Sequence, residues 1–378
     1  MTLPSEAVVR WLAACPVVPR PAEHVELRDA VGRVCAADVR SLVDSPPGEV
    51  AAMDGIAVTA AATTGLRLAA EAYDVVDTGD PLPVGRDAVV VREQVTRDGT
   101  VAVLAHAAVA GRHVRPRGED VATGDLLLRA GSVLRPVDVA LAAAGGHLHL
   151  PVTSRPHVVV VPTGDEVRPL GRPAAPGEVL DTNSLMLVAQ AVEAGATAEA
   201  LPVVPDDPAA LAAAVRAACA TADLVVVGAG SSAGRDDHTA EVVRSLGTVV
   251  VHGLAVRPGH PALVGVVDGT PVLGSPGYPV SAWLAFELLA VPLLAGLLGT
   301  APRARPTTTA RLATDVGSAL DVDDWVRVAV RDGVATPLPG GAGALSSLAT
   351  ADGLLRVPAG TAACAAGDPV EVVLLRPT

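Results

Sequence analysis

One local pattern recurs three times between His157 and Leu298: an apolar β-branched run, then a polar Gly/Pro turn, then a helix-like stretch. Such alternation is typical of a parallel sheet covered by helices. The carboxyl ends of parallel strands meet at one edge, and ligands of open α/β folds bind in the crevice there. The pattern therefore predicts an α/β domain with a ligand site at that edge. The three turns are Pro162-Thr163-Gly164-Asp165-Glu166, residues 228–234, and Ser275-Pro276-Gly277-Tyr278-Pro279.

The bulk properties bound the class of protein. A chain of 378 residues is too long for one ordinary domain, so about two to four are expected. The net charge of −13, from 28 basic and 41 acidic residues, argues against a nucleic-acid partner. The four cysteines are scattered without a C-x-x-C pair, and the N-terminus has no signal-peptide pattern, so a cytoplasmic protein is expected. The longest apolar stretch, Val280 to Leu298, contains Glu287 and Pro292, which favours a buried core helix over a membrane span.

The pattern changes along the chain. Pro4 to Cys15 has helical spacing, and the chain between Ser45 and Gly118 consists of short Val-rich runs typical of a β-rich module. Strand–helix alternation fills residues 155–299, and residues 299–306 read as a linker. Strand-like runs in residues 303–378 then predict a small all-β module. Helices are expected at about Asn183 to Ala194, Pro208 to Ala220, Asp237 to Leu246 and Pro279 to Leu298.

The first turn brings a hydroxyl and two carboxylates to the sheet edge, through Thr163, Asp165 and Glu166. Mg²⁺ prefers such oxygen ligands, usually one or two carboxylates together with substrate phosphates. An ordinary turn with solvated acidic residues would read the same way. A metal or phosphate site is therefore one of two interpretations of this turn.

The second turn is rich in glycine and serine and ends at Asp236-Asp237. Glycines let the backbone approach a ligand, and a following helix supplies a positive N-terminus that favours anions. The spacing is G-x-G-x-x-x-G, and the turn is not the first of the α/β unit, so a nicotinamide site is not expected. A purely structural tight turn remains the alternative.

The third turn pairs with a stiff loop, Arg257-Pro258-Gly259-His260-Pro261. Pro279 stands at a favoured first-turn position of the longest predicted helix. An arginine can grip a phosphate or an oxyanion through two donors. Tyr278 is one of only two tyrosines, so we do not expect it merely to pack in the hydrophobic core. Two rigid proline turns without ligand contacts are the alternative.

Taken in order, these segments and several others resemble the MoeA / gephyrin E-domain family of molybdopterin molybdenumtransferases. The resemblance extends nearly from end to end. It rests on the order of many short motifs, each unspecific by itself. The matching motifs are Met53-Asp54-Gly55, Thr78-Gly79 with Pro81 and Pro83, Arg117-Gly118-Glu119-Asp120, Thr163-Gly164-Asp165-Glu166, Asp181-Thr182-Asn183-Ser184, Asp206-Asp207, Gly230-x-Ser232-x-Gly234-x-x-Asp237, Pro258-Gly259-x-Pro261, Pro276-Gly277-x-Pro279, and Leu345 to Ala349 with Asp352-Gly353.

The resemblance implies a multidomain α/β plus β architecture. Residues 1–43 and 118–154 would form an N-terminal helix with a linking β module, and residues 44–117 an inserted β-rich lobe. Residues 155–299 would form the central α/β molybdopterin-binding domain with a parallel-dominated sheet, and residues 303–378 a C-terminal β-barrel. The family forms elongated homodimers. Its cleft lies between the α/β domain of one subunit and the lobe of the other, which would bring Asp54 and Thr78 to the turns described above.

By the same resemblance, the protein inserts molybdate into adenylylated molybdopterin and releases AMP, assisted by Mg²⁺ or Zn²⁺. A molybdopterin adenylyltransferase is a candidate protein partner. Asp54, Glu166 and Asp237 would form the acidic set for metal or water positioning, with Glu166 and Asp237 as metal ligands and Asp120 and Asp206 as further candidates. The residues expected to bind the substrates are Thr78, Gly230, Ser232, Gly234, Arg257, Pro258, Gly259, His260, Pro276, Gly277, Tyr278, Pro279 and Ser346.

The chain departs from the family pattern at several positions. The chain has no lysine, and the family's K-P-G-K-P loop has Arg257 and His260 in place of its lysines. Where the family has P-G-N-P, this chain has Tyr278 in place of the Asn. Where the family has a pair of glycines in the second turn, one of them is replaced by Ala229. These departures leave two alternatives open. One is a catalytically altered paralogue that binds molybdopterin or a protein partner, and the other is a molybdopterin adenylyltransferase.

Overall fold

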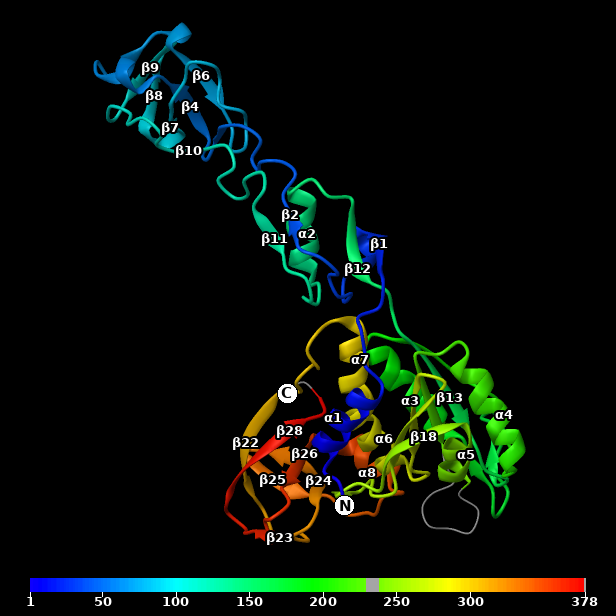
Figure 1. Ribbon diagram of the computed structural model, residues 1–378. Coiled ribbons are helices and arrows are strands. Elements are labelled where there is room, and N and C mark those ends of the chain that lie inside the picture. The colour runs from blue at the N-terminus through cyan, green and yellow to red at the C-terminus, as the bar shows by residue number, and fades with distance from the viewer. Residues whose placement is uncertain (229–237, 377–378) are drawn as a thin grey trace. The chain divides into compact units, whose positions relative to one another are not determined.

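The computed structural model describes residues 1–228 and 238–376, and these form two compact units. One unit contains Met1–Pro21 with Thr153–Thr378, and the other contains Ala22–Val152. Each unit is described by itself (Figure 1).

The centre of the first unit is a six-stranded sheet in the order β16-β13-β17-β21-β20-β18. Strands β16, β13, β17 and β21 are parallel, whereas β20 runs antiparallel to both of its neighbours. The predicted parallel-dominated sheet is therefore confirmed, and the three recurring units supply its central strands β13, β17 and β21. The strands are β13 His157–Pro162, β16 Thr197–Ala200, β17 Leu224–Gly228, β18 Gly247–His252, β20 Leu263–Val267 and β21 Thr270–Ser275.

Both faces of this sheet are buried, which is why its strands read as continuous apolar runs. Along β13, Val158 and Val160 point into one core, while Val159 and Val161 point into the other. The first core also receives α1, α3 and the helical segment 279–298, and the second receives α4 and α5. These helices are α1 Pro4–Ala14, α3 Thr182–Glu193, α4 Pro208–Cys219 and α5 Thr239–Leu246.

The long helical segment after the third turn is one core element in three parts: α6 Pro279–Ala285, a π-helical turn η5 Phe286–Ala290, and α7 Val291–Leu298. Pro292 lacks the N–H that would continue the α-helical ladder and crowds the preceding turn, which accounts for the π turn. The segment is long and apolar enough to span a membrane, but 67% of its most apolar stretch of 18 residues is buried within the protein. The prediction of a buried core helix is confirmed.

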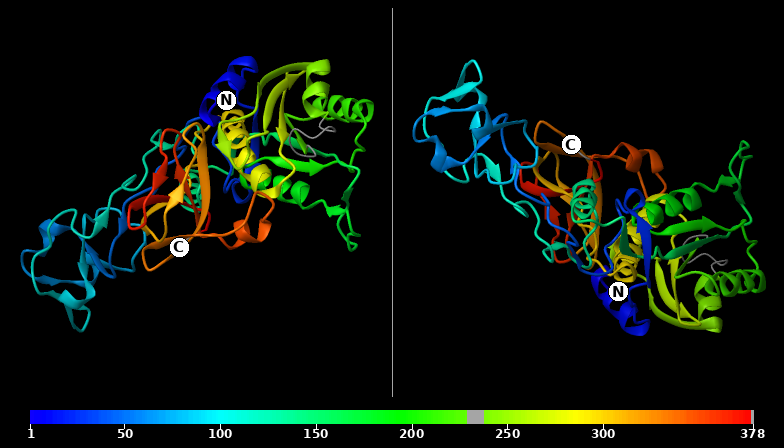
Figure 2. Two further views of the ribbon diagram at one scale, coloured as in Figure 1. Left: turned by 90° about the horizontal axis from the view of Figure 1, so that it is seen from below. Right: turned by 90° about the horizontal axis from the view of Figure 1, so that it is seen from above.

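Residues 303–376 form a second layer on the far side of that helical segment from the sheet (Figure 2). Strand β24 pairs with β25, β25 with β22, β22 with β28, and β28 with β26. Strand β26 also pairs with β24, so the sheet closes into the predicted barrel. The elements are β19 Val256–Arg257, which joins β24, then β22 Thr307–Leu312, β23 Val316–Gly317, β24 Asp323–Arg331, β25 Val334–Pro337, α8 Leu345–Thr350, β26 Gly353–Val357, β27 Ala363–Cys364 and β28 Pro369–Leu374.

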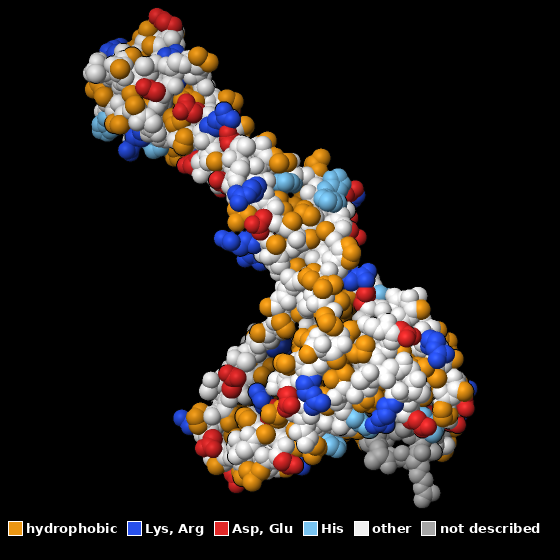
Figure 3. Space-filling view, in the orientation of Figure 1, with side chains coloured by type: hydrophobic (Ala, Val, Ile, Leu, Met, Phe, Trp, Pro, Cys, Tyr) orange, Lys and Arg blue, Asp and Glu red, His pale blue; other side chains and the backbone are white. Residues whose placement is uncertain are grey.

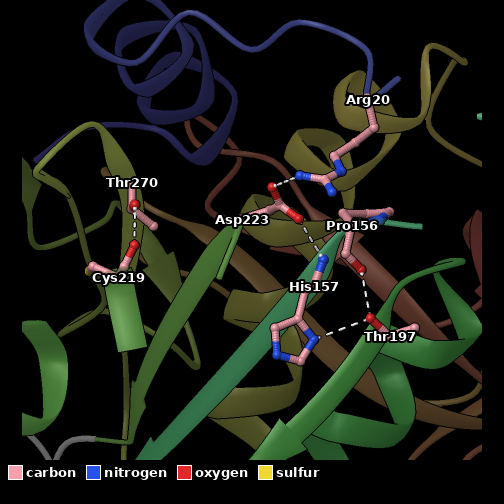
Figure 4. A network of polar contacts seen from close by, with 7 residues as sticks. All are labelled: Arg20, Pro156, His157, Thr197, Cys219, Asp223 and Thr270. Carbon is pink, nitrogen blue, oxygen red and sulfur yellow. Dashed lines mark hydrogen bonds and ion pairs between the residues drawn. The ribbon is translucent and has the colours of Figure 1, made fainter. Parts of the chain in front are cut away.

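The position of the N-terminal helix α1 differs from the expectation. The helix was expected to belong with residues 118–154, but it packs in the unit that contains the α/β sheet. Ala7 and Trp11 are fully buried in the core beneath the α/β sheet, and the Trp11 indole N–H donates to the Gly265 carbonyl at 2.7 Å. The helical periodicity identified an apolar face but could not identify the surface that covers it. The following segment is held to the amino edge of the sheet, where Arg20 pairs with Asp223 and the His157 N–H donates to Asp223 at 2.7 Å (Figure 4).

Replacing Trp11 with alanine is expected to lower the free energy of unfolding by about 3–5 kcal/mol, because it leaves a large cavity beneath the sheet. Trp11→Phe keeps most of the packing but leaves the buried Gly265 carbonyl without its donor, which costs about 1–3 kcal/mol. Denaturant unfolding followed by circular dichroism measures both. Val9→Ala is the control on the same helix, because Val9 is 67% exposed. An equal loss in Val9→Ala would contradict the packing argument.

The second unit is rich in short strands. Within residues 44–117 the described elements are strands and single 3₁₀ turns, as expected for the β-rich lobe. Two three-stranded sheets, β6-β4-β7 and β5-β9-β8, enclose small cores of Ala, Val and Leu together with Ile56 and Tyr73. The strands are β3 Val50–Ala51, β4 Gly55–Val58, β5 Arg67–Leu68, β6 Tyr73–Val76, β7 Ala88–Val91, β8 Val95–Asp98, β9 Val101–Leu104 and β10 Val114–Arg115; the flanking elements are β1 Ala22–Glu26, β2 Val39–Arg40, β11 Leu126–Leu128, α2 Pro136–Ala144 and β12 His149–Thr153.

Candidate active site at the carboxyl edge of the sheet

The turn after β13 is fixed by hydrogen bonds to two other segments of the same chain. The Thr163 hydroxyl donates to the Gly228 carbonyl at 2.8 Å, at the end of β17. Asp165 and Asp206 hold each other, since each backbone N–H donates to the other's carboxylate, at 3.0 and 3.2 Å. Gly164 has a φ of +136°, where a side chain would also collide with Val167. This turn, which carries Glu166, and the segment after β16, which carries Asp206, therefore hold each other in place.

The N-terminus of α3 meets the third turn. Asp181 caps the helix by accepting from the Ser184 N–H at 3.0 Å. The Asn183 side-chain amide donates to the Gly277 carbonyl at 2.7 Å, so the first helical turn of α3 holds the loop that starts α6. The N-termini of α3 and α6 thus lie side by side at the sheet edge, and the dipoles of the two helices favour an anion there. Sequence reasoning quoted Asn183 in a motif but missed this positioning role.

These elements enclose a pocket of about 640 Å³. It lies at the carboxyl ends of β13 and β17 and at the start of α6, where the sequence predicted a crevice. Of the candidate site residues, Glu166, Asp206, Gly277, Tyr278 and Pro279 line it. The other lining residues are Val160, Pro162, Thr163, Val167, Val179, Leu180, Asp181, Thr182, Asn183, Ser184, Leu187, Gly228, Gly343 and Leu345.

The C-terminal module also reaches this pocket, through Gly343 and Leu345. The Val280 N–H donates to the Ala342 carbonyl at 3.0 Å, and Arg327 donates to the Gly341 carbonyl at 3.0 Å. This loop therefore lies against the start of α6. The expected ligand residue Ser346 is exposed on α8, next to Leu345, and does not line the pocket, and neither does Pro276.

The Arg257–Pro261 loop lies at the same edge, between β18 and β20, but does not line the pocket. Arg257 donates to both oxygens of Asp324, at 2.8 and 2.6 Å, which differs from the expected role of gripping a ligand anion. Asp324 is 7% exposed and needs a partner. Burial opposes its ionisation, but the bonds from Arg257 and Ser318 outweigh burial and lower its pKa. The side-chain hydrogen bond to Asp324 raises the pKa of Arg257.

Two further members of that loop also have structural surroundings. The His260 ring Nδ1 lies 3.0 Å from the Leu254 carbonyl, which can only accept, so this nitrogen is the donor. The backbone of Gly259 faces the Ser281 carbonyl in the first turn of α6, and Pro258 follows Arg257 in a cis peptide bond. The loop therefore supports the start of α6 from outside the pocket.

In the second unit, Asp54 is held by three donors. The Thr78 N–H and hydroxyl both donate to Asp54 Oδ1 at 2.8 Å, and Arg92 donates to Oδ2 at 2.8 Å. The bonds from Thr78, with the charge of Arg92, lower the pKa of Asp54, so it is ionised at neutral pH. Both hydrogen-bond donors of Thr78 are therefore bonded to Asp54. Asp120 is exposed, and its N–H donates to the Ser45 carbonyl at 3.0 Å.

The sequence also singled out residues of the second turn. Gly230, Ser232, Gly234 and Asp237 lie outside the described residues, and so does most of the predicted anion loop. Among residues 1–228 and 238–376, no group of three or more His, Cys, Asp or Glu side chains could hold a metal ion. Glu166 and Asp206 share the pocket wall without a His or Cys beside them. Carboxylate oxygens of this kind suit a hard cation such as Mg²⁺ whose coordination substrate oxygens complete.

The face of the molecule in Figure 3 carries acidic and basic side chains interspersed among apolar ones. A nucleic-acid-binding face would instead gather basic side chains. The fold is that of a multidomain α/β protein, with a pocket at the carboxyl edge of its α/β sheet and a C-terminal β-barrel.

Comparisons with known proteins identify the family. Residues 3–146 match the MoeA N-terminal region (domain I and II), residues 159–296 a probable molybdopterin binding domain, and residues 309–375 the MoeA C-terminal region (domain IV). The chain belongs to the MoeA family of molybdopterin molybdenumtransferases, transferases of molybdenum cofactor biosynthesis.

Individual relatives match over most of their length. The chain is 33% identical to molybdopterin molybdenumtransferase 2 of Mycobacterium tuberculosis, over 92% of this chain and 94% of that protein. It is 32% identical to molybdopterin molybdenumtransferase of Haemophilus influenzae, over 78% of each. The solved structure of the molybdopterin biosynthesis MoeA protein from Pyrococcus horikoshii superposes with a TM-score of 0.87, at 31% identity, and covers 100% of both chains.

Proposed function

We propose that this protein inserts molybdenum from molybdate into molybdopterin, using adenylylated molybdopterin as the second substrate and releasing AMP. The observation that carries the proposal is the 640 Å³ pocket, which combines two carboxylates with two helix N-termini in a chain of this family. The carboxylates suit a hard cation, and the helix N-termini suit the phosphates that bridge the pterin and the adenosine.

Each part of the pocket has a role in this proposal. The Thr182 and Asn183 N–H groups at the start of α3 bind phosphate oxygens, the dipole of α6 attracts the same phosphates, and the Asn183 side chain keeps the two helix starts together. Glu166 and Asp206 would hold Mg²⁺, which when bound neutralises charge on the phosphates. Glu166 also orients the water or oxyanion that replaces the phosphate. Asp237 is proposed as a further ligand, on the ground of the resemblance.

We further propose that the protein acts as a homodimer in the cytoplasm. Asp54 and the pocket lie in different units of the chain, and the resemblance implies that a partner subunit supplies the lobe. A molybdopterin adenylyltransferase is the class of enzyme that produces the substrate. Contact with such an enzyme would hand over adenylylated molybdopterin directly.

The test is AMP release from adenylylated molybdopterin in the presence of molybdate and Mg²⁺. We expect stoichiometric AMP release that depends on both additions, measured by liquid chromatography. Pterin binding without AMP release would instead indicate a binding paralogue. ATP-dependent adenylylation of molybdopterin would overturn the proposal in favour of an adenylyltransferase.

A further inference from the structure

An aromatic ring lies exposed in the pocket of a chain that otherwise buries or half-buries its aromatic side chains. Tyr278 lines the pocket and is 56% exposed. The other tyrosine, Tyr73, is 8% exposed and donates to the Thr100 carbonyl, while Trp11 and Phe286 are fully buried. Within the described residues, the Tyr278 hydroxyl makes no hydrogen bond. Neither core packing nor a polar contact accounts for the position of this ring.

The loop around Tyr278 is fixed on both sides. The Asn183 amide holds the preceding Gly277 carbonyl at 2.7 Å, and the Val280 N–H bonds to the Ala342 carbonyl at 3.0 Å. Gly343 lies against the ring: a Cβ added there would be 3.2 Å from the Tyr278 Cδ1 atom. The ring is therefore supported by backbone on one side, while the residue as a whole remains more than half exposed and lines the pocket.

The remaining wall suits a flat, partly apolar group. Val167, Val179 and Leu345 line the same pocket as the carboxylates and helix N-termini, and each is at least partly exposed. A ligand that carries a planar ring and phosphates would satisfy both kinds of surface. An aromatic face stacks on such a ring without reading its hydrogen-bond pattern.

We propose that Tyr278 is the stacking platform for a flat nitrogen heterocycle of the substrate, and thereby sets specificity for its ring-bearing part. The inference rests on the proposed function, whose substrate contains two such rings, a pterin and an adenine. Both share the chemistry that Tyr278 recognises, and the choice between them is made by experiment.

The experiment measures dissociation constants by calorimetry for three probes: AMP, a free 6-substituted pterin, and inorganic pyrophosphate. Tyr278→Leu is expected to weaken binding of one ring probe about tenfold, because aliphatic side chains stack poorly. Tyr278→Phe is expected to stay within about twofold of the wild type, because the ring persists. Pyrophosphate binding is expected to be unchanged in both variants. The ring probe that weakens identifies the heterocycle.

Gly343→Ala supplies a second, independent variant, because its new methyl group must displace the ring. We expect it to weaken the same ring probe, while Gly341→Ala has no effect, since nothing lies within 4 Å of a Cβ at Gly341. Ring binding unchanged in Tyr278→Leu would overturn the proposal. So would equal losses in Tyr278→Phe and Tyr278→Leu, or a matching loss of pyrophosphate binding. Ring binding by a wild-type protein that releases no AMP would sink the proposed function and leave this inference intact.

Discussion

Replacing Glu166 with glutamine is expected to abolish AMP release while leaving the protein folded. Glu166 is exposed in the pocket, and the hydrogen bonds that fix its turn do not involve the Glu166 side chain. Its carbonyl accepts from the Val179 N–H at 2.9 Å, and the Val167 N–H donates to the Gly164 carbonyl at 3.1 Å. The substitution keeps the shape of the turn and removes one negative charge. We expect kcat to fall by about 10²–10³-fold, as when a positioned charge-stabilising group is lost.

The folding control for this variant is thermal unfolding, which should shift by no more than a surface substitution does, within about 0.5 kcal/mol. Glu371→Gln is the matched chemical control, because Glu371 is exposed on β28 and lies outside the pocket. If Glu166→Gln released AMP at a near-normal rate, the carboxylate would have no role in the chemistry. A fall of similar size in Glu371→Gln would mean that net charge, rather than the pocket, controls the rate.

The sequence predicted the α/β domain well because burial of both sheet faces leaves a strong local signal. Val158 to Val161 form a continuous apolar run, and the turns that follow each strand carry Gly and Pro. The position of α1 was not predictable in the same way. Trp11 bonds to Gly265, which is 254 residues away, and no local pattern encodes such a contact. Barrel closure likewise depends on distant pairings, and only the resemblance indicated it.

The candidate site shows the same division between local and distant information. The turns that contain Glu166 and Tyr278 follow apolar runs, so their meeting at one edge was predictable from topology. Arg257 was expected to bind an anionic ligand because its partner, Asp324, stands 67 residues further along the chain. Asn183 reads as an ordinary residue of a helix start, and only the fold shows that its amide holds Gly277. The sequence therefore shows which charged and polar side chains are present, but it does not show which distant residue each of them bonds to.

Asp54→Asn is expected to abolish turnover in the proposed homodimer, because it removes a charge from the β-rich lobe and leaves the pocket of the α/β domain unchanged. Asp54 accepts from Thr78 and Arg92, and its lowered pKa keeps it ionised at neutral pH. A group with a lowered pKa keeps its charged contacts above the ordinary value of 3.8 and loses them only as the pH falls through the lowered pKa. Asparagine leaves the Thr78 bonds possible but places an amide donor against Arg92. The charge that would face the substrate is lost at every working pH.

Mixing the two inactive variants is expected to restore activity, because each active site of the proposed homodimer would draw Asp54 and Glu166 from different subunits. In a mixed dimer, one site then carries both substitutions and the other carries neither. Random exchange of subunits makes about half of the dimers mixed, so about a quarter of wild-type AMP release should return. Denaturation and joint refolding of equimolar Asp54→Asn and Glu166→Gln proteins, followed by the AMP assay, measures this recovery. The control is separate refolding of each variant before mixing, which should stay inactive. If both residues served a site from the same subunit, every site in a mixed dimer would carry one substitution and no activity would return, which would refute the shared site and leave the role of Glu166 standing.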